Sequence, residues 1–231
     1  MKYLEHMAKM RLFKLDDIVL LTGNINTAKS ILSSYEKKNY ISRIRRDYYV
    51  FLDFATKDPV ASTFEIASHI KEDGYLSYHS AFQYYACYNQ VFNELTISSP
   101  KKFNSFTYDF IEYKSDVSFV PLQIDTVADG KIKVTSIERT IVDSIKDINK
   151  AGGLEELLEC ISLVKNVSEE KILEMLKYYN EAFLYQKVGY ILSKYNERFE
   201  LSEKFYKKCK SKLGTKINYI DKNQDNVYVS E

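Results

Sequence analysis

The sequence predicts an α+β fold with helices at both ends and strands between them. Apolar residues recur with helical spacing over much of residues 1–38, and again from residue 134 onward. Between these parts, residues 40–52 and much of residues 91–134 alternate as strands do. The chain has 231 residues, of which 45% are hydrophobic and 28% charged, a composition typical of a folded globular protein.

Two helices joined by a short turn are predicted near the start of the chain. In "FKLDDIVLLTG" the apolar spacing is helical, Asp16 and Asp17 suit the positive end of the helix dipole, and Gly23 can end the helix with a positive φ. Asn24 can cap a second helix. The apolar face of that helix consists of Ile25, Ala28, Ile31, Leu32 and Tyr35. This pattern indicates a helix-turn-helix.

The same stretch nearly matches the phosphate-binding pattern G-x-x-x-x-G-K-[ST], with Gly23, Lys29 and Ser30 in register. The second glycine, which lets backbone amides close around a phosphate, is replaced by Ala28. The preceding residues also have helical spacing, whereas such a loop follows a buried strand. We therefore interpret the match as coincidence and predict no nucleotide site there.

A β-hairpin is predicted directly after the second helix. Residues Tyr40–Ile44 and Tyr48–Leu52 alternate as strands, with a turn near Arg46–Asp47. A helix over residues 1–10 and a short strand at Arg11–Phe13 precede the helix pair. This order predicts an N-terminal winged helix-turn-helix over residues 1–56, followed by a larger mixed α+β domain that ends in a helical, bundle-like segment.

Basic residues are concentrated in the first part of the chain. Residues 1–50 contain ten Lys and Arg against five Asp and Glu, although the whole chain has a net charge of only +1. Such asymmetry favours a nucleic-acid-binding end. The predicted DNA contacts are Asn24, Asn26, Thr27, Lys29, Ser30, Ser33, Lys37, Arg43, Arg45 and Arg46. Two alternatives stay open: charges that protect an edge strand, or a winged helix that docks on a protein.

The larger domain is expected over residues 62–214, after a boundary near residues 55–62 around Asp58-Pro59. It should begin with helices at Phe64–Ile70 and Leu76–Cys87. Strands should follow up to Val134, including "VSFVPLQID" and a hairpin turn at Asp129-Gly130. Helices are then expected in "TSIERTIVDSI", "LEELLECISLV", "SEEKILEMLKYYN", "AFLYQKVGYILSKYN" and "LSEKFYKKCKSKL". Residues 215–231 should form a polar tail.

The larger domain contains few signals of chemistry. Glu112 and Lys114 on an expected strand, with Asp109 nearby, match the acid-x-lysine pattern of metal-dependent nucleases, but such short matches arise easily by chance. His69 and His79 lack a second ligand at i+4, so a structural role is favoured over metal binding. The aromatic cluster Tyr75, Tyr78, Tyr84, Tyr85 and Tyr88 is interpreted as core or contact surface.

Arg139 and Asp143 stand at i and i+4 beside Glu138, a spacing that favours an ion pair on a capped helix over a catalytic acid pair.

No disulfide framework is predicted, because the three cysteines, Cys87, Cys160 and Cys209, are widely separated and odd in number. The start of the chain lacks the pattern of a secretory leader, and no apolar run is long enough for a membrane span. We therefore expect a cytoplasmic protein.

Several segments resemble the AbiEi-type antitoxins, transcriptional regulators of type IV (abortive infection) toxin–antitoxin systems. The segments are "EIASHI" and "YLSYHSAF", then "KVTSIERTIVDSI" and "AGGLEELLECI", then "FLYQKVGYIL". The resemblance covers most of residues 1–213 and is most specific over 64–82 and 133–191.

The resemblance implies a non-enzymatic repressor that needs no cofactor and binds inverted repeats of double-stranded DNA in its own promoter. It also implies an antitoxin domain acting against a nucleotidyltransferase-like toxin without a stable complex. Two molecules are expected to pair on the inverted repeat, and they need not form a dimer in solution. A basic antitoxin surface would correspond to Lys204, Lys207, Lys208, Lys210 and Lys212. The competing hypothesis is a winged-helix protein with a metal-dependent nuclease-like domain around Glu112 and Lys114.

Overall fold

The computed structural model describes residues 3–123 and 125–211. The N-terminal part contains three helices and a three-stranded antiparallel sheet of order β1-β3-β2. Its elements are α1 (Leu4–Met10), β1 (Leu12–Lys14), α2 (Leu15–Thr22), α3 (Ile25–Lys37), β2 (Ile41–Arg45) and β3 (Tyr48–Phe51). This is the helix, strand, helix, helix, hairpin order that the sequence predicts, and the overall α+β class is confirmed.

Local interactions explain the geometry of the helix pair. Gly23 has φ +71°, a left-handed conformation that favours glycine, and its N–H donates to the Val19 carbonyl to end α2. The Asn24 side-chain oxygen then accepts hydrogen bonds from the backbone N–H groups of Asn26 and Thr27 at 2.8 and 3.1 Å. Ala28 is fully buried, so α3 packs closely on its neighbours with its apolar side.

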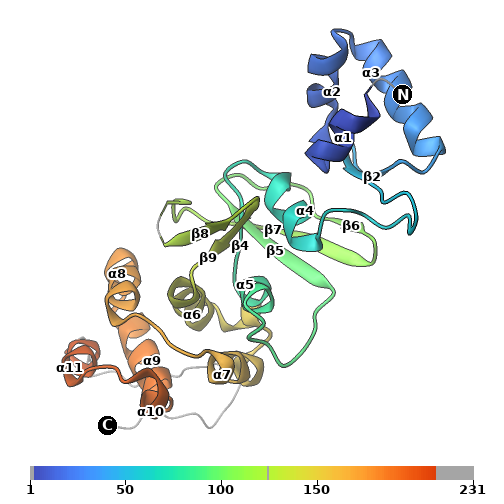
Figure 1. Ribbon diagram of the computed structural model, residues 1–231. Coiled ribbons are helices and arrows are strands. Elements are labelled where there is room, and N and C mark those ends of the chain that lie inside the picture. Colours follow the sequence, from blue (N-terminus) through green and yellow to red (C-terminus); the bar gives the residue numbers. More distant parts are fainter. Residues whose placement is uncertain (1–2, 124, 212–231) are drawn as a thin grey trace.

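A six-stranded mixed sheet forms the centre of the larger part, in the order β6-β7-β5-β4-β9-β8. Its strands are β4 (Tyr75–Leu76), β5 (Glu94–Ser99), β6 (Phe106–Tyr108), β7 (Ile111–Val117), β8 (Thr126–Asp129) and β9 (Ile132–Thr135). Helix α4 (Thr63–Ile70) covers the sheet on the side of the N-terminal part. Helices α5 (His79–Tyr84) and α6 (Ile137–Lys146) lie towards the C-terminal helices (Figure 1).

Two local predictions in this part are wrong. The helix expected over Leu76–Cys87 begins only at His79, because Tyr75 and Leu76 form the central strand β4, where Leu76 is paired with both Ile97 and Val134. Tyr78 lies between β4 and α5 and has a φ of +54°, so the backbone changes direction there before the helix begins. In the segment "VSFVPLQID", strand β7 ends at Val117, and the described residues from 118 to 125 form no strand.

The remaining helices form the C-terminal end of the molecule (Figure 1). They are a 3₁₀ turn η1 (Ile148–Ala151), α7 (Leu154–Leu163), α8 (Glu169–Tyr179), α9 (Ala182–Ser193), the short α10 (Asn196–Phe199) and α11 (Glu203–Lys210). They share one apolar core with α5 and α6. The polar tail predicted for residues 215–231 lies outside the described residues.

The N-terminal sheet has a core on each of its two faces. Ile41, Tyr49 and Phe51 pack among the N-terminal helices. Ile44 and Tyr48 instead belong to the core that contains α4 and the six-stranded sheet. The Tyr48 hydroxyl donates to the Ile66 carbonyl at 3.0 Å, and the Tyr48 ring stacks on His69. The two parts are therefore joined by a continuous core as well as by residues 52–62.

Candidate nucleic-acid interface

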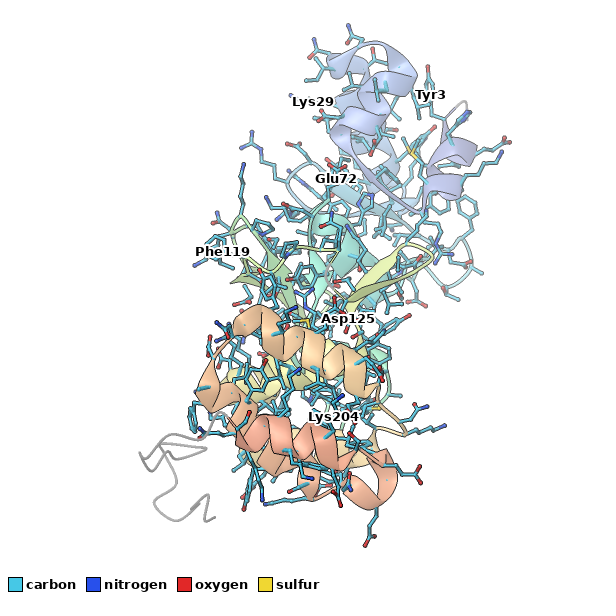
Figure 2. The ribbon with its side chains drawn as sticks, turned by 90° about the vertical axis from the view of Figure 1, so that its left-hand side faces the viewer. Tyr3, Lys29, Glu72, Phe119, Asp125 and Lys204 are labelled. Carbon is cyan, nitrogen blue, oxygen red and sulfur yellow. The ribbon has the colours of Figure 1, made fainter. Side chains whose placement is uncertain are left out.

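The polar side of α3 is exposed along its whole length. The residues predicted there, Asn24, Asn26, Thr27, Lys29, Ser30, Ser33 and Lys37, are all exposed, whereas Ala28, Leu32 and Tyr35 are buried. Lys29 lies at the opposite end of the molecule from Lys204 (Figure 2). Hydroxyl, amide and ammonium groups of this kind can donate to phosphate oxygens and to base edges.

Asn24 also has a structural role at the start of this surface. Its side-chain oxygen is used in capping α3, as described above, so only its amide nitrogen is available to a ligand. Lys29 forms no ion pair with any residue that the structure describes. Its charge is therefore available to a ligand.

The three predicted wing arginines occupy different environments. Arg46 is in the turn between β2 and β3, and its side chain is 89% exposed, 3.4 Å from the Asp47 carboxylate. Arg43 is exposed on β2, and its Nε donates to the Arg45 carbonyl at 3.4 Å. Both residues can reach an external phosphate.

Arg45 of the predicted interface is half-buried and contacts the larger part of the molecule. Its guanidinium lies over the rings of Phe103 and Phe106, with Cζ 5.7 and 5.2 Å from the ring centres, and burial lowers the pKa of Arg45. A register shift between Arg43 and Arg45 breaks the regular alternation of β2, which explains why the two arginines differ. Arg45 therefore connects the β2–β3 hairpin (the wing) to the larger part of the molecule, called the second domain below.

The residues of the nuclease hypothesis are not brought together as one acidic site. The Lys114 ammonium bonds to the Glu94 carboxylate and lies 3.7 Å from that of Glu112, and the bond to Glu94 raises the pKa of Lys114. Asp109 lies in the β6–β7 turn, where it lines a hollow with Ser42. One lysine thus offsets part of the charge of two carboxylates, and Asp109 is not among the partners of Lys114.

His79, Glu156 and Cys160 form the one group within the described residues whose atoms could hold a metal ion. Their arrangement is that of a hydrogen-bonded cluster. Glu156 Oε1 accepts from the His79 ring at 3.0 Å and from the backbone N–H groups of Asn89 and Gln90 at 3.1 and 3.0 Å. Cys160 Sγ lies 3.5 Å from the same oxygen. Glu156 therefore fixes residues 89–90 against α7.

Replacing His79 is expected to weaken the acid sensitivity of stability. Burial lowers the pKa of His79 below its ordinary value of 6.5, although Glu156 acts in the opposite direction. As pH falls through about 6.5, the unfolded chain binds a proton that the native state binds only at lower pH, so the free energy of unfolding decreases.

The variant His79→Gln keeps a hydrogen-bond donor. Its free energy of unfolding should decrease less steeply than that of the wild type as the pH falls from about 7.5 to 5.5. The difference can reach at most about 1.4 kcal/mol per pH unit, because one proton is involved. Urea unfolding at a series of pH values measures it. His69 is present in both proteins and cancels in the comparison. If the free energy of unfolding depends on pH with the same slope in both proteins, the lowered pKa of His79 is contradicted.

The ion pair predicted between Arg139 and Asp143 is confirmed, with Nε 3.3 Å from Oδ2, and both side chains are buried. Further partners come from elsewhere in the chain: the Arg139 guanidinium also donates to Tyr75, Thr126 and the Pro121 carbonyl. Glu138 accepts from the Ser168 backbone N–H at 2.9 Å. These groups have structural partners and leave no open acid pair.

The basic surface expected near the C-terminus lies on α11. Lys204, Lys207, Lys208 and Lys210 are exposed, and Lys207 is 3.5 Å from Glu203, whereas Lys212 is outside the described residues.

Cys87, Cys160 and Cys209 are free thiols. Among the described helices, none combines the length and apolar character needed to cross a bilayer.

Comparison with known proteins gives a likeness in overall fold. No family model matches the sequence, and no curated protein matches it significantly. Among solved structures, the RV2827C protein from Mycobacterium tuberculosis is similar, with a TM-score of 0.62 and 13% sequence identity over 94% of this chain and 82% of that chain. At this identity, the likeness shows that the two proteins share an overall fold and carries no assignment of function.

Proposed function

We propose that this protein is a DNA-binding transcriptional repressor of its own promoter and the antitoxin of a type IV toxin–antitoxin system. The observation that carries the DNA-binding part is the exposed polar side of α3 together with Arg46 at the tip of the adjacent hairpin. The second domain covers the opposite face of the wing sheet and leaves this surface open.

The antitoxin part of the proposal is supported by the sequence resemblance to AbiEi-type proteins. In this proposal the toxin is a nucleotidyltransferase-like protein encoded beside the antitoxin, and the two form no stable complex. The protein works in the cytoplasm, without a cofactor and without catalysis. Co-expression tests this part: the toxin alone should arrest growth, and this protein should restore growth without co-purifying with the toxin.

Binding to a duplex from upstream of the start codon is expected to weaken steeply with salt. Each neutralised phosphate contributes a slope of about −0.9 to log K against log salt, because condensed counterions are released. With about four phosphates neutralised, affinity should fall by about 100-fold between 50 and 200 mM salt. Fluorescence anisotropy measures this, with a shuffled duplex as control. Absence of binding to either duplex at low salt would refute the proposal.

A further inference from the structure

The loop between β5 and β6, residues 100–105, is firmly held by the second domain. The Ser99 hydroxyl donates to the Lys101 carbonyl at 2.9 Å, and the Phe103 N–H donates to the Ser115 hydroxyl at 3.0 Å. The Ser115 N–H in turn donates to the Ser105 hydroxyl at 3.2 Å. Phe103 is only 7% exposed. Because these bonds tie the loop to β7, it has a defined position on the surface.

This loop lies directly beside the wing. The Arg45 guanidinium covers the Phe103 and Phe106 rings, and Phe103 shares a core with Ile44 of β2. Strands β2 and β6 are also in contact. The wing and the loop therefore form one continuous surface whose parts keep a fixed spacing.

The charged residues of the loop are both basic. Lys101 and Lys102 are exposed, and neither forms an ion pair with a residue of the described chain. No acidic residue occurs between positions 95 and 108. Phe103 is buried beside Arg45 of the hairpin, so the two neighbouring ammonium groups are exposed on the loop that contacts the hairpin.

We infer that Lys101 and Lys102 form a second contact with the DNA backbone, adjoining the wing and supplied by the second domain. This inference rests on the proposed DNA-binding function. Lysine ammonium groups on a fixed loop can neutralise phosphates, which adds affinity without reading sequence. Duplex DNA is favoured over an acidic protein as the partner, because the loop continues the basic surface of the wing. The footprint then extends past the half-site covered by α3 and Arg46.

The test compares the wild type with the double variant Lys101→Gln/Lys102→Gln on the promoter duplex and on a shuffled duplex. The slope of log K against log salt should become shallower by about 1.8, corresponding to two lost phosphate contacts. Affinity for both duplexes should fall by a similar factor of about 10 or more. Melting temperature should not change, since both side chains are exposed.

The matched control is Lys165→Gln/Lys177→Gln, which removes the same charge from exposed positions after α7 and on α8, among the C-terminal helices. Its salt slope should equal that of the wild type. If the wild type binds DNA and the loop variant keeps the wild-type slope, the inference fails while the proposed function stands. A loop variant that fails only in growth rescue would assign the loop to a protein partner. If the wild type binds no duplex, both fail.

Discussion

A variant carrying Lys29→Glu together with Arg46→Glu is expected to bind promoter DNA at least about 100-fold more weakly than the wild type. Each substitution removes one cation and adds one anion that phosphates repel. Lys29 is on the exposed side of α3, and Arg46 is at the hairpin tip, so the two changes affect both elements of the proposed interface. Fluorescence anisotropy at constant salt measures the loss.

The fold of this variant should be unaffected, because both side chains are exposed and Arg46 has only a surface contact with Asp47. Circular dichroism and thermal melting check this. Lys165→Glu with Lys177→Glu makes the same change in net charge among the C-terminal helices, at the opposite end of the molecule. If this control loses as much affinity as the interface variant, general electrostatic attraction and not the α3 surface accounts for binding.

Arg139→Leu is expected to lower the free energy of unfolding by about 3–5 kcal/mol, because it leaves the Asp143 carboxylate buried without its cationic partner. The substitution also removes the hydrogen bonds from the guanidinium to Tyr75 and Thr126 and the contact with the Tyr75 ring. Chemical denaturation at neutral pH measures the change. Lys146→Leu on the same helix should cost less than about 1 kcal/mol, since its pair with Glu181 is at the surface.

A double-mutant cycle separates the interaction energy of Arg139 and Asp143 from the energy lost through poorer packing. Asp143→Leu alone leaves the Arg139 charge buried, and it also removes the acceptor of the Tyr179 hydroxyl at 2.6 Å. Combining both substitutions removes both charges, so the double variant should cost less than the sum of the two single variants by at least about 1 kcal/mol. Additive costs would show that the two side chains are not coupled.

Much of the N-terminal part could be predicted because its signals are local. Gly23 and Asn24 mark the turn between two helices by their own backbone and capping preferences, and Ala28 marks the packed side of α3. The hairpin turn at Arg46–Asp47 follows from the alternation on either side of it. The exposed positions on α3 follow from the same helical period, so most of the candidate site was readable from the sequence.

The errors occur where distant contacts decide the structure. Tyr75 and Leu76 form a strand because β5 and β9 supply hydrogen bonds on both sides, a pairing that local spacing does not show. The position of Arg45 depends on an irregularity in β2 and on aromatic rings more than fifty residues away. The proposed contact of Lys101 and Lys102 with DNA could not be predicted for the same reason, because the sequence does not show that their loop packs beside the wing.

The double-sided burial of the wing sheet has a consequence for biosynthesis. Although the helix pair is synthesised early, Ile44 and Tyr48 belong to a core that includes Ile66 of α4 and residues as late as Val134, so this core is complete only when those residues have been synthesised. Until then the nascent chain presents an uncovered apolar face. This apolar face is therefore covered only after more than half of the sequence has been translated, and a fragment that ends earlier would leave the face exposed to solvent.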